Sequence, residues 1–204
     1  MAGVAPLNCR LARESLGVVL KHVADHEWGS SGLTWDDGRG SSTETGGTGM
    51  TLSTQIMTDE QRKSVALEYL KAFDNGGVTS TGGGILDLFA DDAQVYFPKW
   101  GLATGKEAIG ALFTDVGGTI KSIEHHYADF NWVFSGSDVV VCEGTSHGEH
   151  RDGQWRAGLP EWGAGRWCDV FEIRDWKIQR VFIYLDPDYA GTDTARYPWL
   201  NGRT

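Results

Sequence analysis

Cysteine, proline and long apolar runs are all scarce in this chain. Of its 204 residues, only 3 are cysteine and 5 are proline. The cysteines (Cys9, Cys142 and Cys168) are odd in number and lack the spacing of metal ligands, so we expect reduced thiols in a cytoplasmic protein and no disulfide framework. No apolar run approaches the roughly 20 residues needed to span a bilayer.

Positive charge is also in short supply. The chain has 18 Lys and Arg against 28 Asp and Glu, which gives a formal net charge of -10. An acidic surface repels phosphate backbones and anionic lipid headgroups. We therefore expect neither a nucleic-acid partner nor a membrane partner.

The first quarter of the chain does not have the composition of a folded domain. Residues 29–49 are dominated by Gly, Ser and Thr, which cannot bury enough apolar surface to offset the loss of backbone entropy. We predict a flexible, disordered N-terminal extension over 1–57, a compact domain over 58–190 and a C-terminal tail over 191–204.

The first half of the predicted domain has helical signals. Thr58-Asp-Glu-Gln61 is a capping box, and apolar residues at helical spacing follow it up to Phe73. A short helix is expected over 85–90, a strand over 94–97, and a further helix after the cap Thr104-Gly-Lys-Glu107.

The second half has the composition of strands. Four segments are rich in β-branched and aromatic residues and are separated by tight turns; they cover residues 122–134, 138–150, 166–174 and 177–185. Helices followed by a series of long strands predict an α+β fold with an antiparallel sheet that the early helices cover on one face.

Three motifs together resemble the SnoaL-like branch of the nuclear transport factor 2-like superfamily. They are Phe89-Ala-Asp-Asp-Ala93, the Thr104-Gly-Lys-Glu107 cap, and residues 169–175 followed by Lys177-Ile178. The resemblance covers about residues 58–190. It implies a cone-shaped barrel in which a curved antiparallel sheet wraps around three helices and leaves a pocket at one end. The fold hosts isomerases, dehydratases, cyclases, epoxide hydrolases and non-catalytic association domains.

Comparison with ketosteroid isomerases within this superfamily suggests two catalytic positions. The resemblance places Tyr69 at the tyrosine of their oxyanion hole and Asp169 at its protonated acid, a carboxyl group that apolar surroundings keep neutral. Phe97 occupies the position of their base, and a phenyl ring cannot accept a proton. We therefore expect the two hydrogen-bond donors of such an oxyanion hole, Tyr69 and Asp169, without the usual base.

Other activities of the superfamily match less well. Limonene-epoxide hydrolases use an Arg-x-Asp pair, whereas Arg166 and Asp169 here are separated by two residues and fall on opposite strand faces. Their second acid falls near Ile183. Scytalone-dehydratase-like chemistry needs a tyrosine, a histidine and an aspartate, and Tyr69, His126 and Asp169 could supply them.

The residues themselves support some of these positions. Asp169 shares a strand face with Trp167 and Phe171, so loss of hydration should raise its pKa and allow it to act as an acid or a hydrogen-bond donor; simple hydrogen bonding to Arg166 is the structural alternative. His126 shares a face with Trp132 in the predicted strand, which favours it over His125 as the inward ring and as a possible base. Core packing alone would also explain Tyr69 and His126.

Aromatic residues are abundant, with 9 Trp among them. Aromatic walls suit an apolar or aromatic small molecule, although they also suit a dimer interface across the sheet. The residues expected to contact the substrate are Phe97, Trp100, Trp132, Trp167, Phe171 and Tyr184.

Two functions are consistent with this pattern. The first is a cofactor-independent isomerase, cyclase or dehydratase acting on an aromatic or polycyclic small molecule, with Asp169 as the acid, Tyr69 as the donor and His126 as the base. The alternative is a non-catalytic binding or association domain of the same fold. We expect a homodimer formed through the sheet, and no metal or cofactor, because Ser146-His-Gly-Glu-His150 is not a recognised ligand motif and Gly82-Gly-Gly84 lacks the lysine of a phosphate loop.

Overall fold

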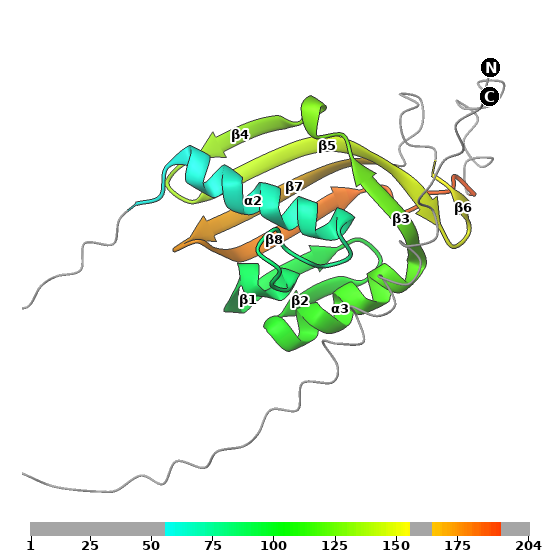
Figure 1. Cartoon of the computed structure of the whole chain (residues 1–204), viewed down its shortest axis with the longest axis horizontal. Helices are drawn as coiled ribbons and strands as arrows, with labels where there is room; N and C mark the ends of the chain where they lie inside the picture. Colours follow the sequence, from blue (N-terminus) through cyan, green and yellow to red (C-terminus); the bar gives the residue numbers. More distant parts are fainter. Residues whose placement is uncertain (1–55, 156–164, 193–204) are drawn as a thin grey trace, which may run out of the picture.

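The computed structural model describes residues 56–155 and 165–192 (Figure 1). The predicted extension over 1–57 lies outside this part of the chain except for its last two residues, and so does most of the predicted tail. Met57 already belongs to the folded domain, since its side chain is buried and its carbonyl accepts a hydrogen bond from Arg62 Nη1 (2.8 Å).

The described residues form an α+β domain. Its elements in chain order are α2 (Asp59–Asp74), the 3₁₀ helix η1 (Ile85–Leu88), β1 (Phe89–Phe97), β2 (Gly101–Thr104), α3 (Lys106–Thr119), β3 (Ile120–His125), the 3₁₀ helix η2 (Tyr127–Asp129), β4 (Asn131–Ser135), β5 (Val139–His150), β6 (Gly153–Gln154), β7 (Arg166–Arg174) and β8 (Lys177–Leu185). The strands β7 and β8 have the predicted bounds.

The strands form one strongly curled sheet with the order β2-β1-β8-β7-β5-β3, and β4 and β6 also pair with β5. The sheet is mixed, because β1 runs parallel to β8 while the other pairs are antiparallel. The prediction of a wholly antiparallel sheet is therefore wrong at this pair. The first strand of the domain enters from the helices and pairs with the last strand, so no hairpin dictates its direction.

Two α-helices and η1 cover the concave face of the sheet. Figure 1 shows α2 lying across the middle strands, while α3 lies beside β1 and β2. The predicted capping box begins α2: the backbone N–H of Gln61 donates to Thr58 Oγ1 (3.3 Å), and the backbone N–H of Thr58 donates to Gln61 Oε1 (2.8 Å). The cap fixes where α2 begins, and its apolar stripe then faces the sheet.

Aromatic rings fill the space between the helices and the sheet. Tyr69 of α2 makes edge-to-face contacts with Phe73, Phe89 and Phe171, with ring centroids 5.0, 5.9 and 5.4 Å away. Phe113 of α3 packs against Phe73 at 5.2 Å. Such contacts add to the stabilisation from apolar burial, so this cluster anchors both helices to the sheet.

One predicted strand is divided in two. The segment 122–134 breaks after His125, where η2 intervenes before β4. The alternation of inward and outward side chains therefore restarts in β4, and residues of β3 and β4 cannot be assigned to a face by a single count.

β5 approaches its neighbours closely at two glycines. A Cβ at Gly148 would lie 2.0 Å from the carbonyl oxygen of Ser122 in β3, and a Cβ at Gly144 would lie 2.6 Å from the Trp167 ring. The backbone at Gly148 has no room to move away without separating β3 from β5.

We predict that Gly148→Ala lowers the free energy of unfolding by about 2 kcal/mol or more, because the added methyl group overlaps a backbone carbonyl. Gly118→Ala in α3 is the matched control, since a Cβ there meets nothing within 4 Å. It should leave stability unchanged or raise it slightly. Urea denaturation measures both, and equal stability of the two variants would contradict this packing.

Candidate functional site

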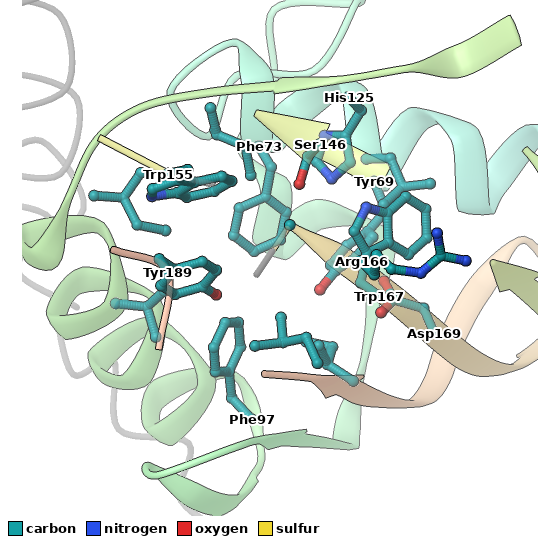
Figure 2. A pocket seen from close by; sticks show the side chains of 17 residues that line it. Tyr69, Phe73, Phe97, His125, Ser146, Trp155, Arg166, Trp167, Asp169 and Tyr189 are labelled. Carbon is teal, nitrogen blue, oxygen red and sulfur yellow. The ribbon is translucent and has the colours of Figure 1, made fainter. Parts of the chain in front are cut away.

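A cavity of about 50 Å³ lies between α2, α3 and the concave face of the sheet (Figure 2). Its walls are mostly aromatic and aliphatic; the lining residues are Tyr69, Leu70, Phe73, Phe97, Val116, Ile120, Ile123, His125, Ser146, Trp155, Gly165, Arg166, Trp167, Asp169, Ile183, Leu185 and Tyr189. Of these lining residues, only Arg166 is exposed. Figure 2 shows Tyr69, Trp167 and Asp169 on one side of the cavity and Trp155 and Tyr189 on the other.

The alternation of β7 directs Asp169 into this cavity. Asp169 is only 4 % exposed, and its Oδ1 atom has no hydrogen-bond partner among the described residues. Burial raises the pKa of Asp169 from its ordinary value of 3.8 to about 8. The carboxyl group is therefore mostly protonated at neutral pH and can donate a hydrogen bond.

Arg166 does not neutralise this acid. It projects from β7 three residues earlier and forms an ion pair with Glu143 on the adjacent strand (3.7 Å). The prediction that Arg166 and Asp169 belong to opposite faces is confirmed by the burial pattern of β7. Simple pairing of Asp169 with Arg166, the structural alternative, does not occur.

Tyr69 comes to the same side of the cavity from α2. It is 1 % exposed, and its hydroxyl group also has no partner among the described residues. Burial and the nearby Asp169 raise the pKa of Tyr69 well above its ordinary value. The phenol stays protonated, so the cavity contains two buried donors, and the described residues satisfy neither the Tyr69 hydroxyl nor Asp169 Oδ1.

A third polar group in the cavity is His125, at the end of β3. Its Nδ1 atom is 2.5 Å from Asp74 Oδ1, and its backbone N–H donates to Asp74 Oδ2 (3.0 Å). The Tyr127 hydroxyl also donates to Asp74 Oδ2 (2.6 Å). Although burial alone would raise the pKa of Asp74, these hydrogen bonds from His125 and Tyr127 lower it, and the group is a carboxylate.

The pairing with Asp74 orients the His125 ring. A carboxylate only accepts hydrogen bonds, so Nδ1 carries the proton and, in the neutral ring, Nε2 has the free lone pair. His125 is buried, and its ring packs edge-to-face on Trp167 with centroids 5.2 Å apart. The arrangement is that of a base held by a second group.

The prediction that His126 faces the cavity is wrong. Its Nδ1 atom is 2.8 Å from Thr145 Oγ1 and its Nε2 atom is 2.8 Å from His147 Nδ1, and Thr145 and His147 lie on the face of β5 opposite the buried residues. The prediction counted one unbroken strand from His126 to Trp132, but η2 interrupts it.

Sequence reasoning therefore missed His125 and Asp74. The spacing of Ile123 and His125 along one strand face was a usable signal, because both residues line the cavity. The partner Asp74 is 51 positions away, at the end of α2, and no local pattern connects the two.

Of the six predicted substrate contacts, two line the cavity and four lie outside it. Phe97 and Trp167 line the cavity. Phe171 is fully buried behind Tyr69, and Trp132 packs against the core under Lys63, whose Nζ atom is 5.6 Å from the ring centroid.

Trp100 and Tyr184 lie outside the cavity as well. The Trp100 indole donates from Nε1 to Asp115 Oδ2 (2.6 Å), and Tyr184 is 52 % exposed on the outer face of β8. Aromatic character alone predicts both as pocket residues, but it does not distinguish the two faces of a sheet.

Within residues 56–155 and 165–192, no three His, Cys, Asp or Glu side chains are grouped so that they could hold a metal ion. The same ranges contain no helix of the length and apolar character that crossing a bilayer requires.

Comparison with known proteins agrees with this architecture. The sequence profile of the SnoaL-like domain matches residues 66–181. A solved NTF2-like protein from Anabaena variabilis is 24% identical, with 66% of this chain and 97% of that chain covered and a TM-score of 0.50. An NTF2-like protein of unknown function from Burkholderia pseudomallei is 15% identical, with 64% and 95% covered and a TM-score of 0.50. No protein of curated function matches the chain.

The raised pKa of Asp169 leads to a prediction about stability. Between pH 3.8 and about 8 the folded protein holds a proton that the unfolded chain has released, so its stability falls as pH rises through this window. The loss is at most about 1.4 kcal/mol per pH unit. In Asp169→Asn this component of the decline should disappear, and the variant should be the more stable protein at pH 8.

Asp92→Asn serves as the control, because Asp92 is an exposed aspartate of β1. Urea denaturation across the pH range measures all three proteins. An Asp169→Asn profile that runs parallel to the wild-type profile would contradict a buried neutral acid.

Proposed function

The chain belongs to the SnoaL-like domain family, and on this premise we propose that it is a cofactor-independent enzyme that moves protons on a small carbonyl compound, as an isomerase, cyclase or dehydratase. One observation carries the proposal: two unpartnered donors, Tyr69 and Asp169, line the same cavity as His125, whose ring is oriented by Asp74. Donors and a base around one cavity are the groups that enolisation requires.

In the proposed reaction, a carbonyl oxygen lies against the Tyr69 hydroxyl and the Asp169 carboxyl. Nε2 of His125 removes a proton from the adjacent carbon, and the electron pair of that C–H bond moves toward the carbonyl oxygen. The two donors stabilise the negative charge that develops on this oxygen. His125 then returns the proton to another carbon in an isomerisation, or to a departing β-hydroxyl group in a dehydration.

The position of the base distinguishes this site from that of the ketosteroid isomerase relatives. The sequence resemblance puts Phe97 at the position of their carboxylate, and Phe97 lines the cavity as an apolar wall. His125 enters from β3 instead. We infer that the substrate carbon that loses its proton faces β3.

The cavity volume narrows the expected substrate. An apolar cavity of about 150 Å³ binds benzene, whereas this one measures about 50 Å³. It suits the carbonyl end of a small molecule more than the whole of the polycyclic ligand expected from the family. The same tight aromatic lining favours the alternative, a non-catalytic domain that binds a small apolar group.

A homodimer through the outer face of the sheet is also proposed. Tyr96 lies near Phe182 and Tyr184 there, with ring centroids 6.0 and 6.4 Å apart. Leu102 is 57 % exposed on the neighbouring edge, and Val133 is exposed on β4. An apolar sheet face of this kind is typical of surfaces that a second copy covers.

Exchange of α-protons tests the enzyme proposal without knowledge of the natural substrate. We expect the wild-type chain to catalyse deuterium incorporation into 2-butanone in D₂O, followed by NMR, and His125→Gln to lose this activity at least about 100-fold because the base is removed. Tyr69→Phe and Asp169→Asn should each lower it about 10-fold or more.

His126→Gln is the matched control, since it removes the adjacent imidazole outside the cavity. It should keep the wild-type rate. Exchange that is absent from the wild-type chain, or equally affected in the two histidine variants, would rule out proton transfer by His125 and favour the binding domain.

For the proposed dimer, Tyr184→Glu should yield a monomer in sedimentation equilibrium, because a charge would be buried in the interface. Trp176→Glu provides the control, as Trp176 is a similarly exposed ring in the turn between β7 and β8. The dimer proposal fails if wild type and Tyr184→Glu have the same mass.

A further inference from the structure

A second hollow, of about 230 Å³, lies next to the cavity and is larger and more polar. Tyr189 lines both. The same chain segments line both hollows. Lys99 follows the cavity residue Phe97 by two positions, and Thr119 directly precedes the cavity residue Ile120. We call it the outer pocket; the residues that define it here are Lys99, Trp100, Thr119, His150, Arg151 and Tyr189.

The outer pocket is lined by two cationic residues, Lys99 and Arg151, and by two acids, Asp152 and Asp188. Among the described residues, no ion pair joins Lys99 or Arg151 to a carboxylate, although the chain as a whole carries a net charge of -10. Within the pocket, Asp152 lies 3.3 Å from His150 Nδ1, and Asp188 accepts hydrogen bonds from Thr192. Two unpaired cations in one concavity attract an anion.

Both cationic side chains are exposed, and the backbone has distinct local geometry at both residues. The backbone N–H of Arg151 donates to the Thr119 carbonyl at the end of α3 (2.9 Å). Lys99 adopts a left-handed conformation with φ 73°, which is unfavourable for a residue with a side chain. Burial and the nearby cations Arg151 and Lys99 lower the pKa of His150 despite Asp152 beside it, so at neutral pH its ring adds no positive charge to the pocket.

Aromatic rings line both hollows. Tyr189, which is common to the two, stacks on Trp155 at 4.5 Å and on His150 at 5.5 Å. Trp100 packs edge-to-face on Phe97 at 5.3 Å. Figure 2 shows Tyr189 across the cavity from Asp169, so a molecule bound by both hollows has its reactive end away from the outer pocket.

We propose that the outer pocket binds an anionic group, a carboxylate or a phosphate, carried by the same molecule whose carbonyl end enters the cavity. Lys99 and Arg151 contact the anion, and Trp100 and Tyr189 pack against the chain that connects it to the carbonyl. The substrate class is therefore a small oxo acid or its phosphorylated counterpart. The inference rests on the proposed function for the reactive end, and its own content is the anion and the residues that bind it.

The relative sizes of the two hollows support this division. The cavity beside Asp169 admits a group of a few heavy atoms, and the outer pocket has room for the remainder. A neutral carbonyl end suits the buried donors, whereas a charged end would lose its hydration there without a counter-charge. The charged end is consequently expected at the cations.

Binding of matched ligands to the full chain tests the inference. The probes are levulinate, which has a methyl ketone and a carboxylate, its neutral amide levulinamide, and 3-oxobutyl phosphate for the phosphate source, each titrated by calorimetry. We expect levulinate or the phosphate to bind at least about 10-fold more tightly than levulinamide. Whichever of the two anions binds more tightly identifies the source.

Lys99→Ala and Arg151→Ala should each remove most of this preference, because they weaken binding of the anions much more than binding of levulinamide. Lys71→Ala on α2 is the control, because it removes the same charge from a residue that lines neither hollow. The inference is overturned if no ligand binds, if the anions bind no better than the amide, or if the preference survives in both alanine variants.

The outcome separates this inference from the proposed function. If the anion preference depends on Lys99 and Arg151 but no ketone exchanges its protons, the outer pocket stands and the enzyme proposal fails. If 2-butanone exchanges through His125 but the anions have no advantage, the enzyme proposal stands and the outer pocket inference fails.

Discussion

Burial of the Asp169 carboxyl group is the constraint on which the rest of the site depends. β7 places this acid among aromatic rings, with no cation beside it and no partner for Oδ1 among the described residues. Removing a carboxylate from water in this way is so costly that the group retains its proton instead. A neutral acid and the Tyr69 phenol together form a donor pair in a mostly apolar cavity, and neither Asp169 Oδ1 nor the Tyr69 hydroxyl has a partner among the described residues, at a cost in stability.

The second half of the site depends on a different kind of interaction. His125 is placed by the end of β3 and oriented by Asp74 at the end of α2, so the base exists only because helix and sheet meet there. The acid side and the base side come from separate elements and converge on a cavity too small for a large ligand. Because of this size, the rest of a larger ligand would lie outside the cavity, and the proposed place for it is the outer pocket with its two cations.

Much of the fold could be predicted from the sequence, because its signals are local. The capping box of α2 and the bounds of β7 and β8 follow from turn chemistry and residue type, and the Asp169 environment follows from alternation along one strand. The parallel pairing of β1 with β8 could not be predicted, since it joins the two ends of the domain. The 3₁₀ helix η2 decides that His125, and not His126, faces the cavity. The sequence has no strong turn signal that would predict this break in the strand.

The most direct test of this account is the titration of the Asp169 side chain itself. With ¹³C-labelled aspartate, NMR can follow each carboxyl carbon across pH, and the signal missing from Asp169→Asn identifies Asp169. The account predicts a midpoint near the value of about 8 that burial produces. A midpoint close to the ordinary 3.8 would mean that the carboxylate is charged at neutral pH. The donor pair, and the chemistry proposed from it, would then be wrong.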